Sequence, residues 1–143
     1  MYKHHLRLIL LGFLFVTLFL PMGDDTPNWL FSLWYSLHLF AAIPDLIAEP
    51  NIGHLILWMG LLLGFLVIQI LILFNLCLLF RKWERWYRIS LLVLFPVTWW
   101  FVLFRIDPLY RSVGYWANPI LVSIAALMEI GFITYERLKE STD

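Results

Sequence analysis

Residues 52–80 carry no formally charged side chain, and this run constrains the fold more than any other stretch of the chain. It is 29 residues long, and few polar residues interrupt its apolar sequence. Roughly 20 apolar residues in a helix cross the hydrocarbon core of a bilayer, at about 1.5 Å per residue. The run therefore predicts a membrane-spanning helix, which we place at residues 54–80.

Three further apolar stretches predict membrane spans at residues 8–20, 89–104 and 117–135. The whole chain is 62% hydrophobic and 14% charged, against about 25% charged for a typical soluble domain. Lys3, Arg7 and the first apolar stretch resemble a secretory signal, but no pair of small residues marks a cleavage site. We expect an uncleaved first helix and one all-α domain over residues 1–143, a polytopic four-transmembrane-helix bundle.

The basic residues cluster between the spans in a way that predicts the topology. Only Arg105 and Arg111 lie on the outer side of the predicted membrane. The other eight flank the cytoplasmic ends of the spans: Lys3, Arg7, Arg81, Lys82, Arg85, Arg88, Arg137 and Lys139. The positive-inside rule then places both termini in the cytoplasm, and a bacterial inner membrane is the expected location.

Residues 28–48 are apolar enough to be a fifth span, but an odd number of crossings would separate Arg7 from Arg81. We therefore expect an outer interfacial or re-entrant helical segment, broken or kinked at Pro44. Its polar and aromatic residues, with one residue of the following stretch, are Trp29, Trp34, His38, Asp45, Glu49 and His54. Imidazole and carboxylate groups can bind zinc, but the spacing lacks a tight motif, and we predict solvated interface residues and no metal site.

Glu129 is an acidic residue well inside the fourth apolar stretch, roughly 12 Å from Arg137 at helical rise. An ionised carboxylate at such a depth is costly, so Glu129 needs a partner or a proton. Gln69 and Asn75 lie at similar depths in the second stretch, and we predict a hydrogen bond from the protonated acid to one of them. A docking site for another subunit and a proton or cation relay are the alternatives.

Gly60 and Gly64 form a GxxxG motif, which lets another helix approach closely. On the fourth stretch, the small residues Ser123 and Ala126 lie on the same helix face as Glu129, at a spacing of three residues. These patterns predict that the second and fourth spans are neighbours, and they favour an intramolecular contact over a homodimer.

No catalytic motif, nucleotide-binding loop or paired haem-ligating histidines occur in the sequence. The net charge of zero gives no pull toward nucleic acid. We expect a non-enzymatic protein without cofactors whose partners are membrane lipids and other membrane protein subunits. It would be an accessory or scaffold subunit that docks through Gly60, Gly64 and the Glu129 region. Two alternatives are an immunity-type protein that neutralises a pore-forming toxin, and a metal- or lipid-dependent enzyme acting at the outer interface.

Overall fold

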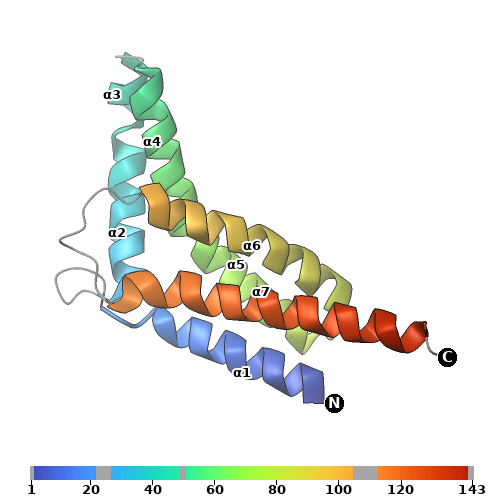
Figure 1. Ribbon diagram of the computed structural model, residues 1–143. Coiled ribbons are helices and arrows are strands. Elements are labelled where there is room, and N and C mark those ends of the chain that lie inside the picture. The colour runs from blue at the N-terminus through green and yellow to red at the C-terminus, as the bar shows by residue number, and fades with distance from the viewer. Residues whose placement is uncertain (1, 22–26, 49–50, 105–112, 142–143) are drawn as a thin grey trace.

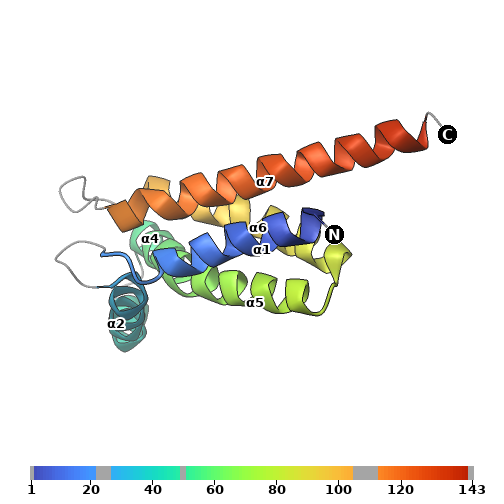
Figure 2. The same ribbon diagram turned by 90° about the horizontal axis from the view of Figure 1, so that it is seen from below.

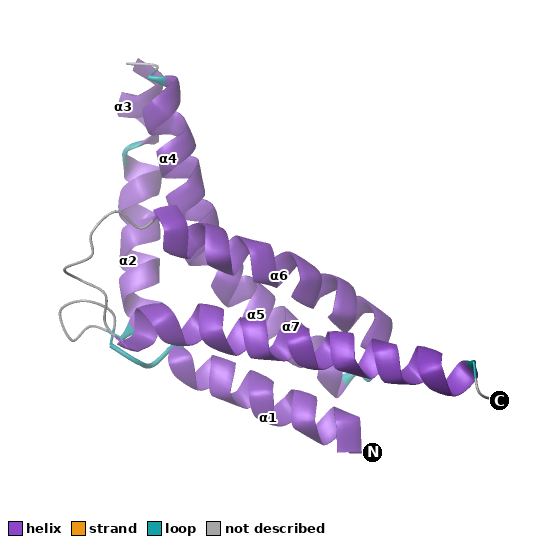
Figure 3. Ribbon diagram, viewed as in Figure 1, coloured by secondary structure: helices purple, strands orange, loops and turns teal. Residues whose placement is uncertain are grey.

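The computed structural model describes residues 2–21, 27–48, 51–104 and 113–141, and every regular element in these ranges is helical (Figure 3). The all-α prediction is confirmed at this level. The elements are α1 (Tyr2–Thr17), α2 (Asn28–Ala41), α3 (Ile43–Ala48), α4 (Ile52–Leu62), the π-helical turn η1 (Leu63–Val67), α5 (Ile68–Phe80), α6 (Glu84–Phe104) and α7 (Val113–Glu140).

Helices α1, α5, α6 and α7 lie side by side (Figure 1). Both α1 and α6 pack against α5 and α7, so α5 and α7 occupy diagonal positions, as Figure 2 shows from below. Fully buried aliphatic side chains fill the centre: Leu11, Leu14, Ile72, Leu79, Leu94 and Val122. The prediction that the second and fourth apolar stretches are neighbours is wrong for these packed helices, because α1 and α6 lie between them.

The run at residues 52–80 is helical throughout, as predicted, but it is not one straight helix. The π-helical turn η1 divides it, and α4 leaves the direction of α5 at this point (Figure 1). A π turn inserts an extra residue into the helix and is a recognised cause of bending. As a result, α4 packs beside α2, and the two helices with α3 form a projection that we call the arm.

The arm contains the segment predicted to lie at the outer interface. Helix α2 ends at Ala41, and Pro44 lies in the first turn of α3. Proline fits a first helical turn but cannot continue a helix from the preceding one. The predicted break at Pro44 is therefore present, and α2 is capped by the backbone N–H of Ala42, which donates to the carbonyl oxygen of His38 at 3.1 Å.

Two helices, α6 and α7, are each long and apolar enough to cross a membrane. Helix α5 is apolar but shorter, because η1 separates it from α4. Length and composition thus support membrane insertion for two helices of the four that the sequence predicts.

The amino end of α1, the turn between α5 and α6 and the carboxyl end of α7 all lie at one end of the packed helices (Figures 1 and 2). We call this the basic end. Its cations are Lys3, Arg7, Arg81, Lys82, Arg85, Arg88, Arg137 and Lys139. The structure thus brings together the eight residues that the sequence assigns to one side, whereas Arg105 and Arg111 fall outside the described residues.

Candidate functional site

Arg7 and Glu129 form a buried ion pair between α1 and α7. Arg7 is fully buried and Glu129 is 4% exposed. The guanidinium binds the carboxylate through two nitrogens: Nε donates to Oε1 at 2.5 Å and Nη2 donates to Oε2 at 2.9 Å. This two-point geometry is the strongest arrangement for an arginine and a carboxylate, because both hydrogen bonds are charge-assisted and parallel.

Four further side chains extend this pair into what we call the ion-pair network. Arg88 Nε donates to Glu129 Oε2 at 3.3 Å, and Arg88 Nη2 donates to Glu136 Oε2 at 3.0 Å. Lys3 Nζ donates to Glu136 Oε1 at 2.9 Å. Glu84 Oε2 lies 3.3 Å from Arg7 Nη1. Three cations therefore face three carboxylates, and the formal charge of the network is zero.

Helical spacing puts these groups on matching faces. Lys3 and Arg7 are four residues apart on α1, and Glu84 and Arg88 are four apart on α6. Residues four apart lie on one helix face, and residues seven apart return to nearly the same direction after two turns. Glu129 and Glu136 have that spacing on α7, so each helix presents an aligned charged face at the basic end.

The network runs from the interior to the surface. The Arg7 side chain has no exposure and that of Glu129 has 6%, whereas the Glu136 and Glu84 side chains are 38% and 55% exposed. A lone charge at the buried positions would cost several kcal/mol in desolvation. Mutual neutralisation removes most of that cost and fixes α1 and α7 relative to each other, which indicates a structural clasp.

Aromatic rings lie over two cations of the network, Arg7 and Lys3. The Arg7 guanidinium carbon lies 5.4 Å from the centre of the Tyr87 ring and 5.7 Å from that of Phe132. Lys3 Nζ lies 5.4 Å from Phe132 and 5.5 Å from Tyr135. Ring faces attract cations and exclude water, so these contacts add to the stability of the buried charges.

The predicted partners of Glu129 are wrong. Asn75 Nδ2 donates instead to the carbonyl oxygen of Leu71 within α5, at 2.8 Å. Gln69 Nε2 has no hydrogen-bond partner among the described residues. Both residues lie on α5, diagonal to α7, whereas Arg7 reaches Glu129 from the adjacent α1.

The GxxxG motif packs within the molecule, but against α6 and not α7. A Cβ atom on Gly64 would overlap the ring of Phe101, and one on Gly60 would lie 3.8 Å from Trp100 Nε1. The predicted close approach is therefore real at Gly64, with a different neighbour. The small-residue face of α7 also meets α6: Trp99 Nε1 donates to Ser123 Oγ at 2.9 Å, and Ala126 is half-buried.

Two polar contacts that the sequence analysis missed hold the other end of α7. The Thr17 hydroxyl donates to Asn118 Oδ1 and joins α1 to α7, while the Tyr115 hydroxyl donates to the carbonyl oxygen of Val102 and joins α7 to α6. Asn118 is the second residue of the predicted fourth span, at its outer edge, so its depth gave no reason to expect a buried partner.

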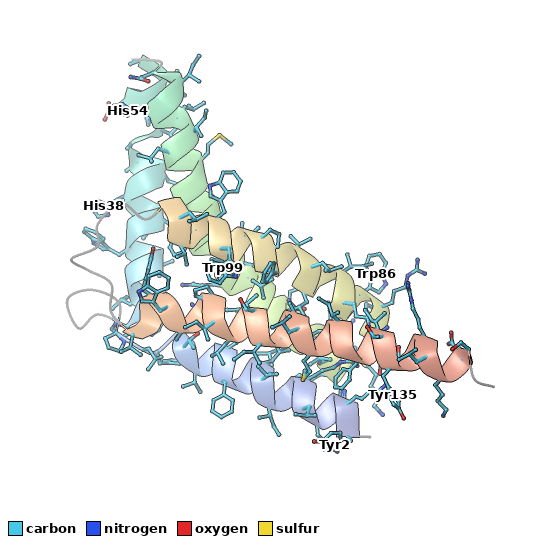
Figure 4. The ribbon with its side chains drawn as sticks, in the orientation of Figure 1. Tyr2, His38, His54, Trp86, Trp99 and Tyr135 are labelled. Atoms are coloured by element: carbon cyan, nitrogen blue, oxygen red, sulfur yellow. The ribbon has the colours of Figure 1, made fainter. Side chains whose placement is uncertain are left out.

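The predicted interfacial residues are spread along the arm. The Trp34 and His38 rings on α2 have centres 3.9 Å apart, and His54 on α4 lies at another height (Figure 4). Trp29 and Asp45 are exposed, and Glu49 falls outside the described residues. Among the described side chains, no group of three or more histidine, cysteine or acidic residues could hold a metal ion.

The ion-pair network is therefore the most developed polar site in the described structure, and its geometry holds helices together. Comparisons of the chain with protein-family models, with curated proteins and with solved structures find no match.

Proposed function

We propose that this chain is an integral membrane protein with four crossings, a four-helix bundle made by α1, the run from α4 to α5, α6 and α7. The shared position of both termini and the α5–α6 turn supports an even number of crossings. The positive-inside rule then places the basic end in the cytoplasm and the arm toward the outer side of a bacterial inner membrane.

We further propose that the protein is a non-enzymatic subunit that docks onto a larger membrane assembly through the arm. The observation that carries this proposal is the apolar surface of α2, α3 and α4, which project from the other helices. Its exposed side chains include Leu33, Trp34, Leu37, Phe40, Ile47, Ile52, Ile56 and Met59. Aromatic residues and methionine are enriched in the cores of protein interfaces, and exposed His38 adds a polar group to this surface.

The GxxxG motif and Glu129, which the sequence predicts as docking sites, make contacts inside the molecule. Gly64 packs against Phe101, and Glu129 binds Arg7 and Arg88. A second protein would have to displace these contacts to use the same groups. The arm requires no such displacement, so it is the better docking surface.

Site-specific photocrosslinking followed by purification in mild detergent tests this proposal. A photoreactive residue in place of Leu37 on the arm should give one adduct of constant mass, and the same residue in place of Phe13, exposed on α1, should not. Both positions carry exposed apolar side chains, so lipid contact alone would affect them equally. Equal labelling of the two positions would contradict docking through the arm.

A matched purification experiment tests the affinity. With Trp34→Ala and Leu37→Ala together, the partner that crosslinking identifies should no longer co-purify with the protein. Phe13→Ala with Leu103→Ala, at exposed positions on α1 and α6, should retain it. Isolation of the unaltered protein as a single species would instead favour the toxin-neutralising alternative.

A further inference from the structure

Five cations at the basic end remain outside the ion-pair network: Arg81, Lys82, Arg85, Arg137 and Lys139. All five are exposed, and none forms an ion pair with a described carboxylate. Glu140 is the one described carboxylate at this end that the network does not use. The packing of the helices therefore separates three neutralised cations from five whose charge faces outward.

The turn between α5 and α6 holds Arg81 and Lys82, and Arg85 follows in the first turn of α6. Trp83 N donates to the carbonyl oxygen of Leu78 at 2.9 Å, and Lys82 N donates to that of Leu79 at 3.0 Å. This pair of hydrogen bonds is the Schellman arrangement that closes helix carboxyl ends. It satisfies the last carbonyl groups of α5 with backbone donors, which leaves the side chains of Arg81 and Lys82 available to an external group.

Lys82 occupies a backbone conformation that normally belongs to glycine. Its φ angle is +56°, in the left-handed region where a side chain costs roughly 1 kcal/mol. Glycine would close the same turn without that cost. A lysine at this position adds a cation to the tip of the turn at some expense in stability.

Exposed aromatic side chains lie near the cations at the basic end. Trp83 and Trp86 are 50% and 59% exposed, and the Arg81 guanidinium carbon lies 5.6 Å from the centre of the Trp83 ring. Figure 4 shows Trp86, Tyr135 and Tyr2 at this end of the molecule. Tryptophan and tyrosine favour the headgroup level of a bilayer, where lipid phosphates lie.

We propose that the α5–α6 turn and the first turn of α6, with Arg137 and Lys139 of α7, bind the phosphate headgroups of anionic phospholipids. Among the described residues, five cations outside the network stand against one carboxylate, which suits an anionic surface, and exposed tryptophans suit the headgroup level. The proposal rests on the membrane placement given above, but it does not depend on the partner that the arm binds. Because the five cations are exposed, their attraction to an anionic leaflet should weaken as the salt concentration rises.

Purified full-length protein in bilayer vesicles provides the test. Spin-labelled phosphatidylglycerol and spin-labelled phosphatidylcholine are added in turn, and the fraction of label immobilised at the protein surface gives their relative association. We expect phosphatidylglycerol to be preferred. Arg81→Gln with Lys82→Gln and Arg85→Gln should remove much of this preference, with about fivefold lost for each cation that contacts the lipid surface.

A charge-conserving variant is the matched control. Arg81→Lys with Arg85→Lys keeps the net charge and should keep the preference. Equal association of both lipids with the unaltered protein, or an unchanged preference in the glutamine variant, would overturn the proposal. Retention of the preference only until free inorganic phosphate is added at millimolar concentration would identify a soluble anion site and overturn the lipid assignment. Failure of the protein to insert into any vesicle would instead contradict the membrane placement.

Discussion

Arg7 and Glu129 are stable in the interior because each neutralises the other through two hydrogen bonds at 2.5 and 2.9 Å. Their burial makes the pair sensitive to loss of one member. Removing one partner of a buried pair leaves an uncompensated charge, whereas replacing both with apolar residues removes the charges together. The side chain of Arg88, which is 25% exposed, can retain Glu136 when Glu129 is absent.

The first prediction follows from this asymmetry. Glu129→Leu should lower the free energy of unfolding by about 3–5 kcal/mol, because Arg7 would stay buried without its two-point partner and only the exposed Glu84 carboxylate would remain near it. Arg7→Leu combined with Glu129→Leu should cost much less than the sum of the two single changes. Unfolding by sodium dodecyl sulfate in mixed micelles, followed by tryptophan fluorescence, measures both.

Glu129→Gln distinguishes a charged carboxylate from a protonated one. An amide keeps the shape of the side chain but cannot neutralise Arg7, so we expect a clear loss of stability. A protonated acid that serves as a neutral hydrogen-bonding group would tolerate the change. Stability equal to that of the unaltered protein would therefore contradict the ion pair.

Lys82 gives a second prediction at the scale of one residue. Lys82→Gly should raise the free energy of unfolding by up to about 1 kcal/mol, because glycine adopts the φ of +56° without steric cost. Lys82→Ala is the control: it removes the charge but keeps the Cβ atom. If alanine stabilised the protein as much as glycine, charge repulsion and not backbone conformation would be the cause.

At the scale of the elements, the π-helical turn η1 decides how residues 52–80 are used. The turn contains Gly64, and the ring of Phe101 on α6 fills the space that a side chain would take there. After η1 in the chain, α5 packs with α1 and α6. Before η1, α4 packs beside α2 and also contacts α6. The arm therefore begins at the turn where η1 packs closely against α6.

We expect Gly64→Ala to lower the free energy of unfolding by about 1–3 kcal/mol, the usual cost of overpacking. Gly131→Ala is a matched control, since no atom lies within 4 Å of its added Cβ, and alanine favours a helix. Gly60→Ala, with its nearest atom at 3.8 Å, should also have little effect. Equal effects at positions 64 and 131 would show that helix propensity and not packing dominates.

A rescue experiment identifies the atoms involved. Phe101→Leu shortens the side chain that the new Cβ would meet, so the Gly64→Ala and Phe101→Leu variant should recover part of the loss. The recovery is measured as a coupling energy in a double-mutant cycle. A strictly additive cycle would argue that Gly64 acts through the backbone of η1 alone.

In the whole molecule, the described cations gather at one end, and there they divide into paired and unpaired groups. Eight cations gather at one end of the packed helices, and three of them are then neutralised by carboxylates. This leaves five exposed cations at the outside of the basic end and the paired ones between the helices. The same end also holds all three lysines of the chain, Lys3, Lys82 and Lys139.

The lysine distribution gives a topological prediction. A membrane-impermeant amine reagent should leave the protein unmodified when it is added to intact spheroplasts, and should modify it after permeabilisation. Lys82 and Lys139 are exposed, so access to the basic end is not limited by folding. His54→Cys in a Cys77→Ser background is the control for the opposite side, because His54 is exposed on α4 of the arm, and an impermeant maleimide should label it in intact spheroplasts. Amine labelling before permeabilisation would reverse the predicted orientation.

Composition and spacing were enough to predict the helical class, the apolar runs and the break at Pro44. They also grouped the eight cations of the basic end. These properties depend on local composition and on spacing along the chain, which are present before any helices pack. The need for a partner at Glu129 was equally visible, because it follows from the depth of one carboxylate in an apolar stretch.

The contacts between helices depend on how the helices pack. The sequence predicts Arg7 at the end of a span and Gln69 or Asn75 as the partner of Glu129, since depth along a helix gives no information about the order of helices around a core. The diagonal placement of α5 and α7 excludes those partners and brings α1 to Glu129. The same order turned Gly64 toward Phe101. Helix adjacency arises from packing summed over whole surfaces, and no local pattern in this chain encodes it.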